Sequence, residues 1–298
     1  MKLRTSPATN QHPVKLNVLQ ILLINEHFLL LSESILKSTD NSFCKDYEIS
    51  PLLEKFCQDR ISSADSLAVP PIAVHEAGMY VTQLKNKKSM GPDKINSLLL
   101  KIALPYVVES LTYINNLCLE QNCFPPALKT AKVIPLLKTK DLSDPNNFGP
   151  ISLLSILSKP LERHIHKHLT QFIEDRHLFH PSQSGFRQRH SCHTALIRVC
   201  DSWLTAINQA QFTGAVFLDF KKAFDLVNHT ILLKRLSIYL QNSSTVSLFK
   251  SYLQDRTQRV FLNVNFSTEG VVKCGVPQGL VLPGHFYLIY LLMTCSFI

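Results

Sequence analysis

A single carboxylate follows a short apolar stretch in the second half of this 298-residue chain. The stretch Gly214-Ala215-Val216-Phe217-Leu218 leads directly into Asp219, which is the pattern of a short buried strand with a carboxylate at its end. A carboxylate there suits Mg²⁺, because this hard cation prefers oxygen ligands and keeps waters that a substrate phosphate can replace. The same residues also fit an ordinary strand followed by a helix that Asp219 or Asp225 caps.

Two other groups give weaker chemical signals. His164 and His168 are four residues apart in a predicted helix, which is metal-ligand spacing. The glutamate of the zincin pattern and a third ligand are missing, so a solvated basic face is the favoured interpretation. Phe186, Arg187 and Arg189 place an aromatic ring beside guanidinium groups. They could stack on a base and hold phosphates, or Phe186 could simply anchor a loop.

The chain is basic as a whole. Lys and Arg number 31 against 22 Asp and Glu, which gives a net charge of +9 and a pI of about 9.1. This balance fits a polyanionic partner, since binding cations release the counterions of nucleic acid. Lys85, Lys87, Lys88 and Lys94 surround the turn at residues 91–93, where they either contact a phosphate backbone or form a solvated surface.

Six segments, taken in chain order, resemble the sequence blocks of reverse transcriptases of the kind that non-LTR (LINE-like) retrotransposons carry. The segments are Ser89-Met90-Gly91-Pro92-Asp93-Lys94-Ile95, Ala131-Lys132-Val133-Ile134-Pro135-Leu136-Leu137-Lys138, Pro150-Ile151-Ser152-Leu153-Leu154-Ser155, Ser184-Gly185-Phe186-Arg187, the stretch from Gly214 to Asp225, and Gly275-Val276-Pro277-Gln278-Gly279. The resemblance covers roughly residues 76–290. It says nothing specific about the first 75 residues.

The resemblance implies an α+β fold, the right-hand polymerase architecture of fingers, palm and thumb. It places the fingers at residues 76–213 and part of the palm, without the thumb, at residues 214–298. Residues 1–75 would be an N-terminal extension or linker that is partly disordered. The implied reaction is template-directed addition of deoxynucleotides to a primer 3′ end, with an RNA template, a DNA primer and Mg²⁺.

The resemblance also implies roles for individual residues. Asp219 would be the first metal-binding aspartate, helped by the backbone carbonyl of Phe220. The residues expected at the nucleotide are Lys138 at the triphosphate, Phe220, Phe224 against the sugar, and Gln278 and Gly279 in the pocket. The residues expected at the template are Phe186, Arg187 and Arg189.

The sequence departs from the family pattern at three places. Gly149 stands where the family carries a triphosphate-binding arginine, and Leu280-Val281-Leu282-Pro283-Gly284 replaces the family's Ser-Val-Leu-Gly-Pro. The Ala-Asp-Asp motif, which supplies the other metal-binding aspartates, does not occur within the 298 residues. We therefore expect a reverse transcriptase fragment without activity. The alternatives are a basic nucleic-acid-binding remnant, or a longer chain that continues into the missing motif.

Apolar periodicity and breaker residues predict the elements that must position these groups. The predicted helices are 14–37, 72–85, two helices within 96–121 separated by Pro105, 151–174, 194–208, 231–240, and 245–253 capped by residues 242–244. The predicted strands are 131–137, placed at a sheet edge by Pro135, 215–218, and a hairpin of 259–264 with 270–276.

The apolar stretches and cysteines set the expected compartment. Residues 18–31 are interrupted by polar residues and 286–298 are only thirteen, whereas a spanning helix needs about 20. No membrane anchor is therefore expected. The eight cysteines show no zinc-knuckle spacing and no secretory signal precedes them, so reduced thiols in a cytoplasmic or nuclear protein are expected.

Overall fold

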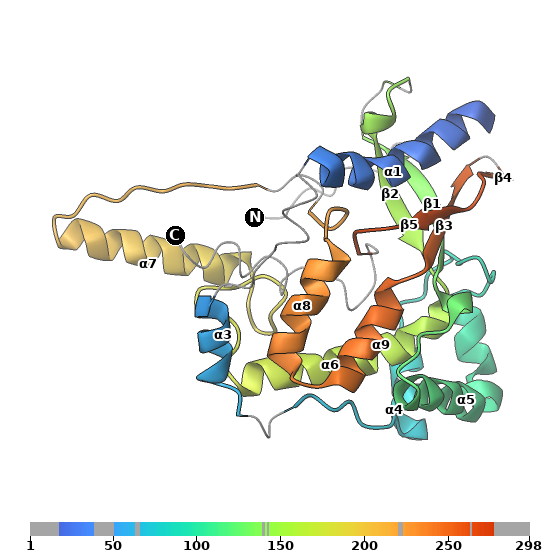
Figure 1. Cartoon of the computed structure of the whole chain (residues 1–298), viewed down its shortest axis with the longest axis horizontal. Helices are drawn as coiled ribbons and strands as arrows, with labels where there is room; N and C mark the ends of the chain where they lie inside the picture. Colours follow the sequence, from blue (N-terminus) through green and yellow to red (C-terminus); the bar gives the residue numbers. More distant parts are fainter. Residues whose placement is uncertain are drawn as a thin grey trace.

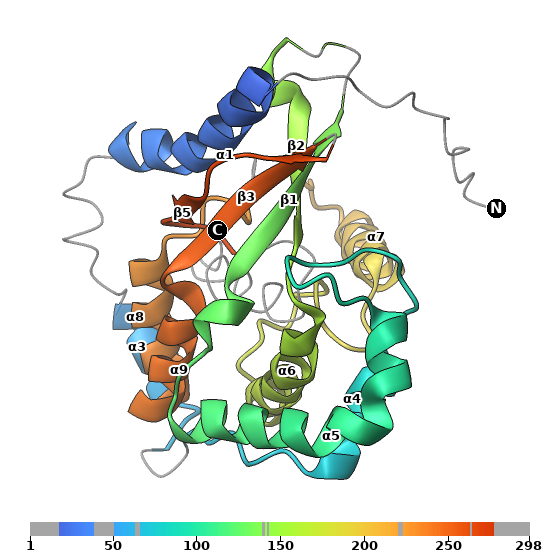
Figure 2. The ribbon, with the colours of Figure 1, turned by 90° about the vertical axis from the view of Figure 1, so that its right-hand side faces the viewer.

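The computed structural model of the chain describes residues 18–38, 51–62, 66–138, 141, 143–219, 223–262 and 264–276. In Figures 1 and 2 a helical body lies below a twisted mixed sheet, and α1 crosses one side of that sheet. The helices are α1 Val18–Ser38, α3 Pro51–Gln58, α4 Val74–Thr82, α5 Ser97–Glu120, α6 Lys159–Asp175, α7 Cys192–Asn208, α8 His229–Leu240 and α9 Ser243–Leu253, with short 3-10 turns η1 Pro126–Leu128, η2 Pro145–Asn147 and η3 Ile156–Ser158. The strands are β1 Thr130–Leu137, β2 Phe148–Leu153, β3 Arg256–Leu262, β4 Asn265–Phe266 and β5 Gly270–Val272.

The sheet joins distant parts of the chain. Its order is β2-β1-β3-β4, and β5 also pairs with β3. β1 runs antiparallel to β2 and parallel to β3, with Val133 opposite Val260. The mixed α and β content agrees with the expected class. The predicted boundary between fingers and palm at residue 213 stays a prediction, because β1 and β3 share one sheet across it.

Pro135 does not place β1 at the sheet edge, so that expectation was wrong for the strand as a whole. Pro135 lies opposite Pro150 in β2, and neither residue has an N–H to donate. The pair is therefore a non-hydrogen-bonded one, and the missing N–H of Pro135 is on the side away from β2. The parallel ladder with β3 has already ended at Val133, so the proline interrupts no bond.

Three clusters of buried apolar side chains hold the elements together. The largest joins α3, α6, α8 and α9, with Leu161, Leu232 and Phe249 at its centre. The second packs Ile21 and Ile24 of α1 onto the sheet, and the third joins α4 to α5. The described part of residues 1–75 therefore packs against the body in both of the first two clusters. Whether this region serves as a linker is not tested by the packing.

Two predicted helix boundaries were wrong, and tertiary packing explains both. α5 is continuous through Pro105, because Leu100 before the proline and Leu111 after it pack into the same cluster with α4. Residues Ile151–Leu153 are strand rather than helix, because they pair with β1. Helix α6 starts only at Lys159, with Pro160 in its first turn, where a proline costs no hydrogen bond.

The predicted strand at residues 215–218 was also wrong. Residues 211–219 are extended but pair with no described strand, and Val216 and Phe217 are 86% and 85% exposed. In Figure 1 this segment starts at the far end of α7 and runs back above that helix toward the body of the molecule, without joining the sheet. An apolar strand needs a neighbour to pair its backbone groups, and no described residue supplies one.

Most of the remaining predicted elements are confirmed. The strand β1 and the helices α1, α4, α7, α8 and α9 lie within a few residues of their expected bounds. The predicted hairpin pairs differently, because β5 pairs with residues 256–258 of β3, whereas residues 261 and 262 pair with β4, which lies between the two expected strands. Asn242 caps α9 as predicted, since its side chain accepts a hydrogen bond from the N–H of Thr245 at 3.0 Å. In the described part of the chain, α5 alone is long and apolar enough to span a membrane, a test that core helices also pass.

Candidate nucleotide and nucleic-acid site

A cavity of about 320 Å³ lies between the sheet, α1 and the segment before α8. It collects residues from four of the six segments that resemble reverse transcriptase blocks. From these segments come Leu136 and Lys138, the stretch Pro150–Ser152, Asp225, and Gly275 with Val276. Phe28 and Leu29 of α1 and the strand β3 complete the wall. The fold therefore brings together segments that are far apart in the sequence.

Lys138 stands at the end of β1, beside Gly149 of β2. Its backbone N–H donates to the carbonyl of Asn147 at 2.8 Å, and its side chain lines the cavity. A Cβ at position 149 would lie 2.7 Å from Cε of Lys138, closer than carbon atoms pack. The lysine stem therefore fills the space that a side chain at 149 would need.

Gly275 joins the segment after Asp219 to the segment that leads toward Gln278. Its N–H donates to the carbonyl of Val227, and the N–H of Val276 donates to the carbonyl of Phe224, both at 2.8 Å. Gly275 has φ +83°, and a Cβ there would lie 2.7 Å from the carbonyl oxygen of Asp225. Only glycine fits this close approach without strain.

The predicted nucleotide and metal residues differ in how they are placed. Phe224 is partly buried, and its ring contacts that of Phe186 edge to face, with centroids 6.2 Å apart. Asp219 lies on the exposed segment 211–219 and does not line the cavity. Phe220, Gln278 and Gly279 lie outside the described residues.

Magnesium needs several oxygen ligands at one place. Within the described ranges, no group of three or more His, Cys, Asp or Glu side chains could hold a metal ion. Asp219 therefore belongs to no such described group. The described residues do not form a complete magnesium site.

The two predicted template arginines have different surroundings. Arg187 donates from Nε and Nη2 to the two carboxylate oxygens of Glu174, at 3.2 and 2.8 Å, and lies over the ring of Phe179. Arg189 is exposed, and it lines a second hollow of about 440 Å³ with His166, Lys167 and His190 among others. The guanidinium of Arg187 thus holds the loop to α6, whereas Arg189 faces solvent.

The histidine face of α6 is not solvated, which corrects the favoured interpretation. His164 is fully buried, and its Nε2 donates to the carbonyl of Pro70 at 2.7 Å. Burial lowers the pKa of His164, although this hydrogen bond acts in the opposite direction. The ring of His168 lies 4.5 Å from that of His164. The spacing of the two histidines therefore lets their rings pack against each other, while His164 bonds to the segment before α4.

The lysine-flanked turn connects two further family-like segments. A Cβ at Gly91 would lie 2.6 Å from the carbonyl oxygen of Leu154, and Ser155 Oγ donates to the carboxylate of Asp93 at 2.5 Å. The turn is therefore fixed to the strand end after β2. The four surrounding lysines are exposed.

Two buried cations were missed by the sequence analysis. Lys129 and Arg256 both line the cavity and are almost completely buried. Arg256 donates from Nε to the carbonyl of Tyr252 at 2.7 Å, and its guanidinium lies 4.3 Å from the centre of the Tyr252 ring. Burial lowers the pKa of Lys129, whereas the charges of Asp255 and Cys123 act to raise it. No local sequence pattern distinguishes these residues from surface cations.

Comparison with known proteins defines the class. Residues 137–293, more than half of the chain, match the family model described as reverse transcriptase (RNA-dependent DNA polymerase). The chain therefore belongs to the reverse transcriptase family, and its relatives are the polymerases of non-LTR retrotransposons.

The relatives are proteins of mobile elements. The chain is 34% identical over 226 residues to a probable RNA-directed DNA polymerase from transposon BS of Drosophila melanogaster, and 32% identical over 226 residues to the RNA-directed DNA polymerase from mobile element jockey of Drosophila funebris. Each alignment covers 76% of this chain and 25% of the relative. The chain thus matches about a quarter of the length of these curated relatives.

Proposed function

We propose that this chain is the part of a retrotransposon RNA-directed DNA polymerase that holds the template and the incoming nucleotide. The observation that carries the proposal is the convergence of four family-like segments on one cavity, at the end of which Lys138 lies. An ammonium at that place supplies a point charge for a phosphate group. The partners under this proposal are an RNA template, a DNA primer and deoxynucleoside triphosphates.

The residue roles in this proposal come from the family resemblance. Lys138, which lies at the end of β1, contacts the triphosphate. The resemblance assigns Phe224 to the sugar, where its ring would clash with a 2′-hydroxyl, and assigns Gln278 and Gly279, which are outside the described residues, to the nucleotide. Arg189 contacts the template backbone, while Phe186 offers a half-exposed ring for stacking. Arg187 supports this loop through Glu174 rather than contacting the template itself.

The 298 residues do not polymerise deoxynucleotides under this proposal. Two bound Mg²⁺ ions would stabilise the attacking and leaving oxygens, but Asp219 is exposed and belongs to no described group of three or more possible metal ligands. Losing several kcal/mol of charge stabilisation costs several decades in rate, since about 1.4 kcal/mol is a factor of ten. The other metal ligands must come from elsewhere.

A second candidate function is that of a basic nucleic-acid-binding protein without a nucleotide site. The net charge of +9 favours it as much as it favours the first candidate. The two differ in one property, because only a polymerase segment has a reason to bind deoxynucleoside triphosphates in the cavity beside Lys138. A general cationic surface binds a triphosphate no better through Lys138 than through any other lysine.

The test measures binding of a labelled RNA–DNA template–primer, and separately of a labelled deoxynucleoside triphosphate, at two salt concentrations. We expect nucleic-acid affinity to fall steeply with salt, and Arg189→Ala to reduce the salt slope by about one. Lys138→Ala should weaken triphosphate binding. Lys250→Ala is the matched control, because Lys250 is exposed on α9 and lines neither cavity.

Salt-independent affinity would contradict the proposal. Equal losses of triphosphate binding in Lys138→Ala and Lys250→Ala would favour the second candidate, since both variants change the net charge equally.

A further inference from the structure

The end of α5 brings two cysteines together. Gln121 caps the helix, and Asn122 takes the left-handed conformation with φ +50°. The N–H of Cys123 donates to the carbonyl of Cys118 at 3.0 Å, and the N–H of Asn122 donates to the carbonyl of Leu119 at 3.4 Å. These two bonds define a Schellman motif, in which the side chains at the positions of Cys118 and Cys123 commonly contact each other.

The backbone bond limits the distance between the two cysteines. Their Cα atoms cannot be more than about 6.9 Å apart, because covalent geometry places them within about 2.4 and 1.5 Å of the bonded oxygen and nitrogen. Since the connecting path is bent, the true separation is shorter. Disulfides span Cα distances of about 4.4–6.8 Å. The Cα separation of the two cysteines is therefore within the range that a disulfide spans.

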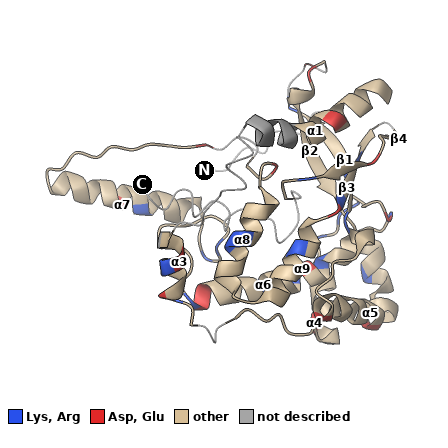
Figure 3. Cartoon of the chain, in the orientation of Figure 1, with Lys and Arg blue, Asp and Glu red and all other residues tan. Residues whose placement is uncertain are grey.

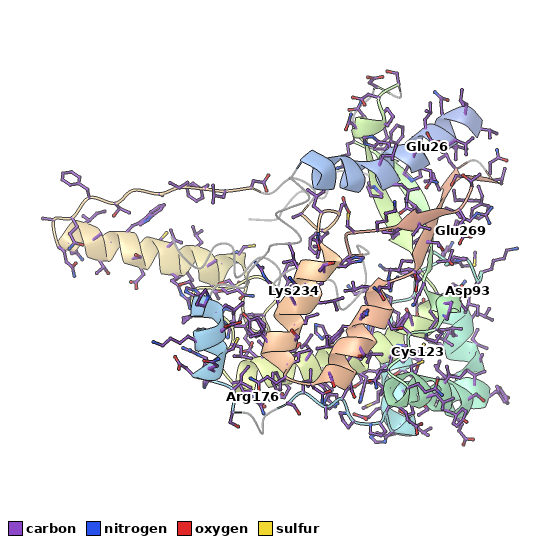
Figure 4. All side chains as sticks on the ribbon, in the orientation of Figure 1. Glu26, Asp93, Cys123, Arg176, Lys234 and Glu269 are labelled. Atoms are coloured by element: carbon purple, nitrogen blue, oxygen red, sulfur yellow. The ribbon has the colours of Figure 1, made fainter. Side chains whose placement is uncertain are left out.

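The two thiols differ in their surroundings. Cys123 is exposed in the loop after α5, near the end of α9 (Figure 4), where Ser251 Oγ lies 4.0 Å from its sulfur. Cys118 is buried, and burial raises the pKa of its thiol to about 11, with the neighbouring Cys123 acting in the same direction. Lys129 is close enough for Cys123 to affect its pKa.

We propose that Cys118 and Cys123 form a thiol modification site that a small-molecule disulfide oxidises to an intramolecular disulfide. The thiolate of Cys123 attacks one sulfur of the oxidant, forming a mixed disulfide and releasing one thiolate. The thiol of Cys118 then loses its proton and attacks the sulfur of Cys123, releasing the second thiolate. Two protein thiols are oxidised and one disulfide molecule is reduced to two thiols. This site is independent of the proposed polymerase function.

The experiment exposes the full chain to oxidised glutathione, blocks the remaining thiols by alkylation, and digests with trypsin for mass spectrometry. No Lys or Arg lies between residues 101 and 129, so both cysteines are in one peptide that contains no other cysteine. We expect this peptide to become lighter by two hydrogen atoms and to resist alkylation. A reducing thiol should restore the original mass.

Two variants and an internal control make the result specific. Cys118→Ser should stop at a glutathione adduct on Cys123, and Cys123→Ser should leave Cys118 unmodified. Cys192 and Cys200 are both exposed, but they are eight positions apart in a helix, which is about 12 Å along its axis, so they should take up glutathione without bonding to each other. Circular dichroism of each variant checks that the fold is intact.

A saturated glutathione adduct on Cys123 of the unaltered chain, with no bond to Cys118, would overturn the proposal. So would a bond between Cys192 and Cys200 in equal yield, because that would show that proximity in the folded chain does not direct the reaction.

Discussion

Gly275 determines how one wall of the cavity is held in place. Its backbone passes so close to Asp225 that a methyl group would lie 2.7 Å from a carbonyl oxygen, and its φ is +83°. Together with the hydrogen bonds from residues 275 and 276, this contact fixes one wall of the cavity to the segment after Asp219. Position 275 requires glycine because of its positive φ and the close carbonyl oxygen of Asp225.

We predict that Gly275→Ala destabilises the protein by about 1–3 kcal/mol, because the positive φ and the close carbonyl both oppose a Cβ. Urea unfolding of the variant and the parent chain measures the difference. Gly185→Ala is the matched control, since nothing lies within 4 Å of a Cβ at that position. Equal stability of Gly275→Ala and the parent would show that this contact is not formed.

The sequence indicated which segments contribute residues to the cavity, but not what surrounds the individual side chains. The resemblance pointed to Lys138 and to the segments of the cavity, and the structure gathers those that it describes. It could not reveal that Arg187 pairs with Glu174, that His164 is buried, or that Arg256 lines the cavity. These facts depend on which distant element covers a side chain, and no spacing in the sequence carries that information.

At the scale of elements, α6 couples stability to pH. Its buried His164 has a pKa below the ordinary value of 6.5, chiefly because of burial. The unfolded chain therefore binds more protons than the folded chain between the lowered pKa and 6.5. The unfolding free energy should fall as the pH drops below about 6.5. Burial lowers the pKa of His166 and His229 as well, so they contribute in the same direction.

We predict that His164→Asn weakens this pH dependence, because asparagine does not titrate. Chemical unfolding at a series of pH values between 5 and 8 measures it, with a slope per histidine of at most about 1.4 kcal/mol per pH unit. The exposed His193→Asn variant is the control and should keep the parent slope. An unchanged slope in His164→Asn would contradict the burial of this ring.

Within the described ranges, segment 211–219 is exposed at every residue and should be accessible to proteases. It is extended, exposed and unpaired with any described strand, and such segments are preferred sites of proteolysis. We predict that brief chymotrypsin digestion cuts first at Phe212 or Phe217. Phe249 is fully buried in α9 and provides the internal control. Cleavage at Phe249 before either of the exposed phenylalanines would contradict the described arrangement.

Elements with local signals could be predicted, and elements held by distant partners could not. The capping side chain of Asn242 marks the start of α9, and Asn228 caps α8 in a similar way. The continuity of α5 through Pro105 and the strand at Ile151 depend on α4 and β1 respectively. The strand expected at 215–218 has suitable residues, but a strand also requires a neighbour to pair with.

At the scale of the whole molecule, an apolar surface remains uncovered. α7 has no buried residues and carries only Arg198 and Asp201 as charged side chains at neutral pH, so in Figure 3 it is almost entirely tan. Leu196, Ile197 and Leu204 are each at least 60% exposed. Together with the adjacent segment 211–219, this surface favours association of the chain, because large exposed apolar patches are unusual on isolated proteins.

The central claim is that the chain holds nucleic acid but does not itself complete a polymerase site. Primer extension on an RNA template, with Mg²⁺ and all four deoxynucleotides, tests it most directly. The Asp219→Ala variant is run in parallel, and a retardation gel confirms that both chains bind the template–primer. We predict a retained complex without extended primer for both chains. Template-dependent extension by the unaltered chain that Asp219→Ala abolishes would contradict the account.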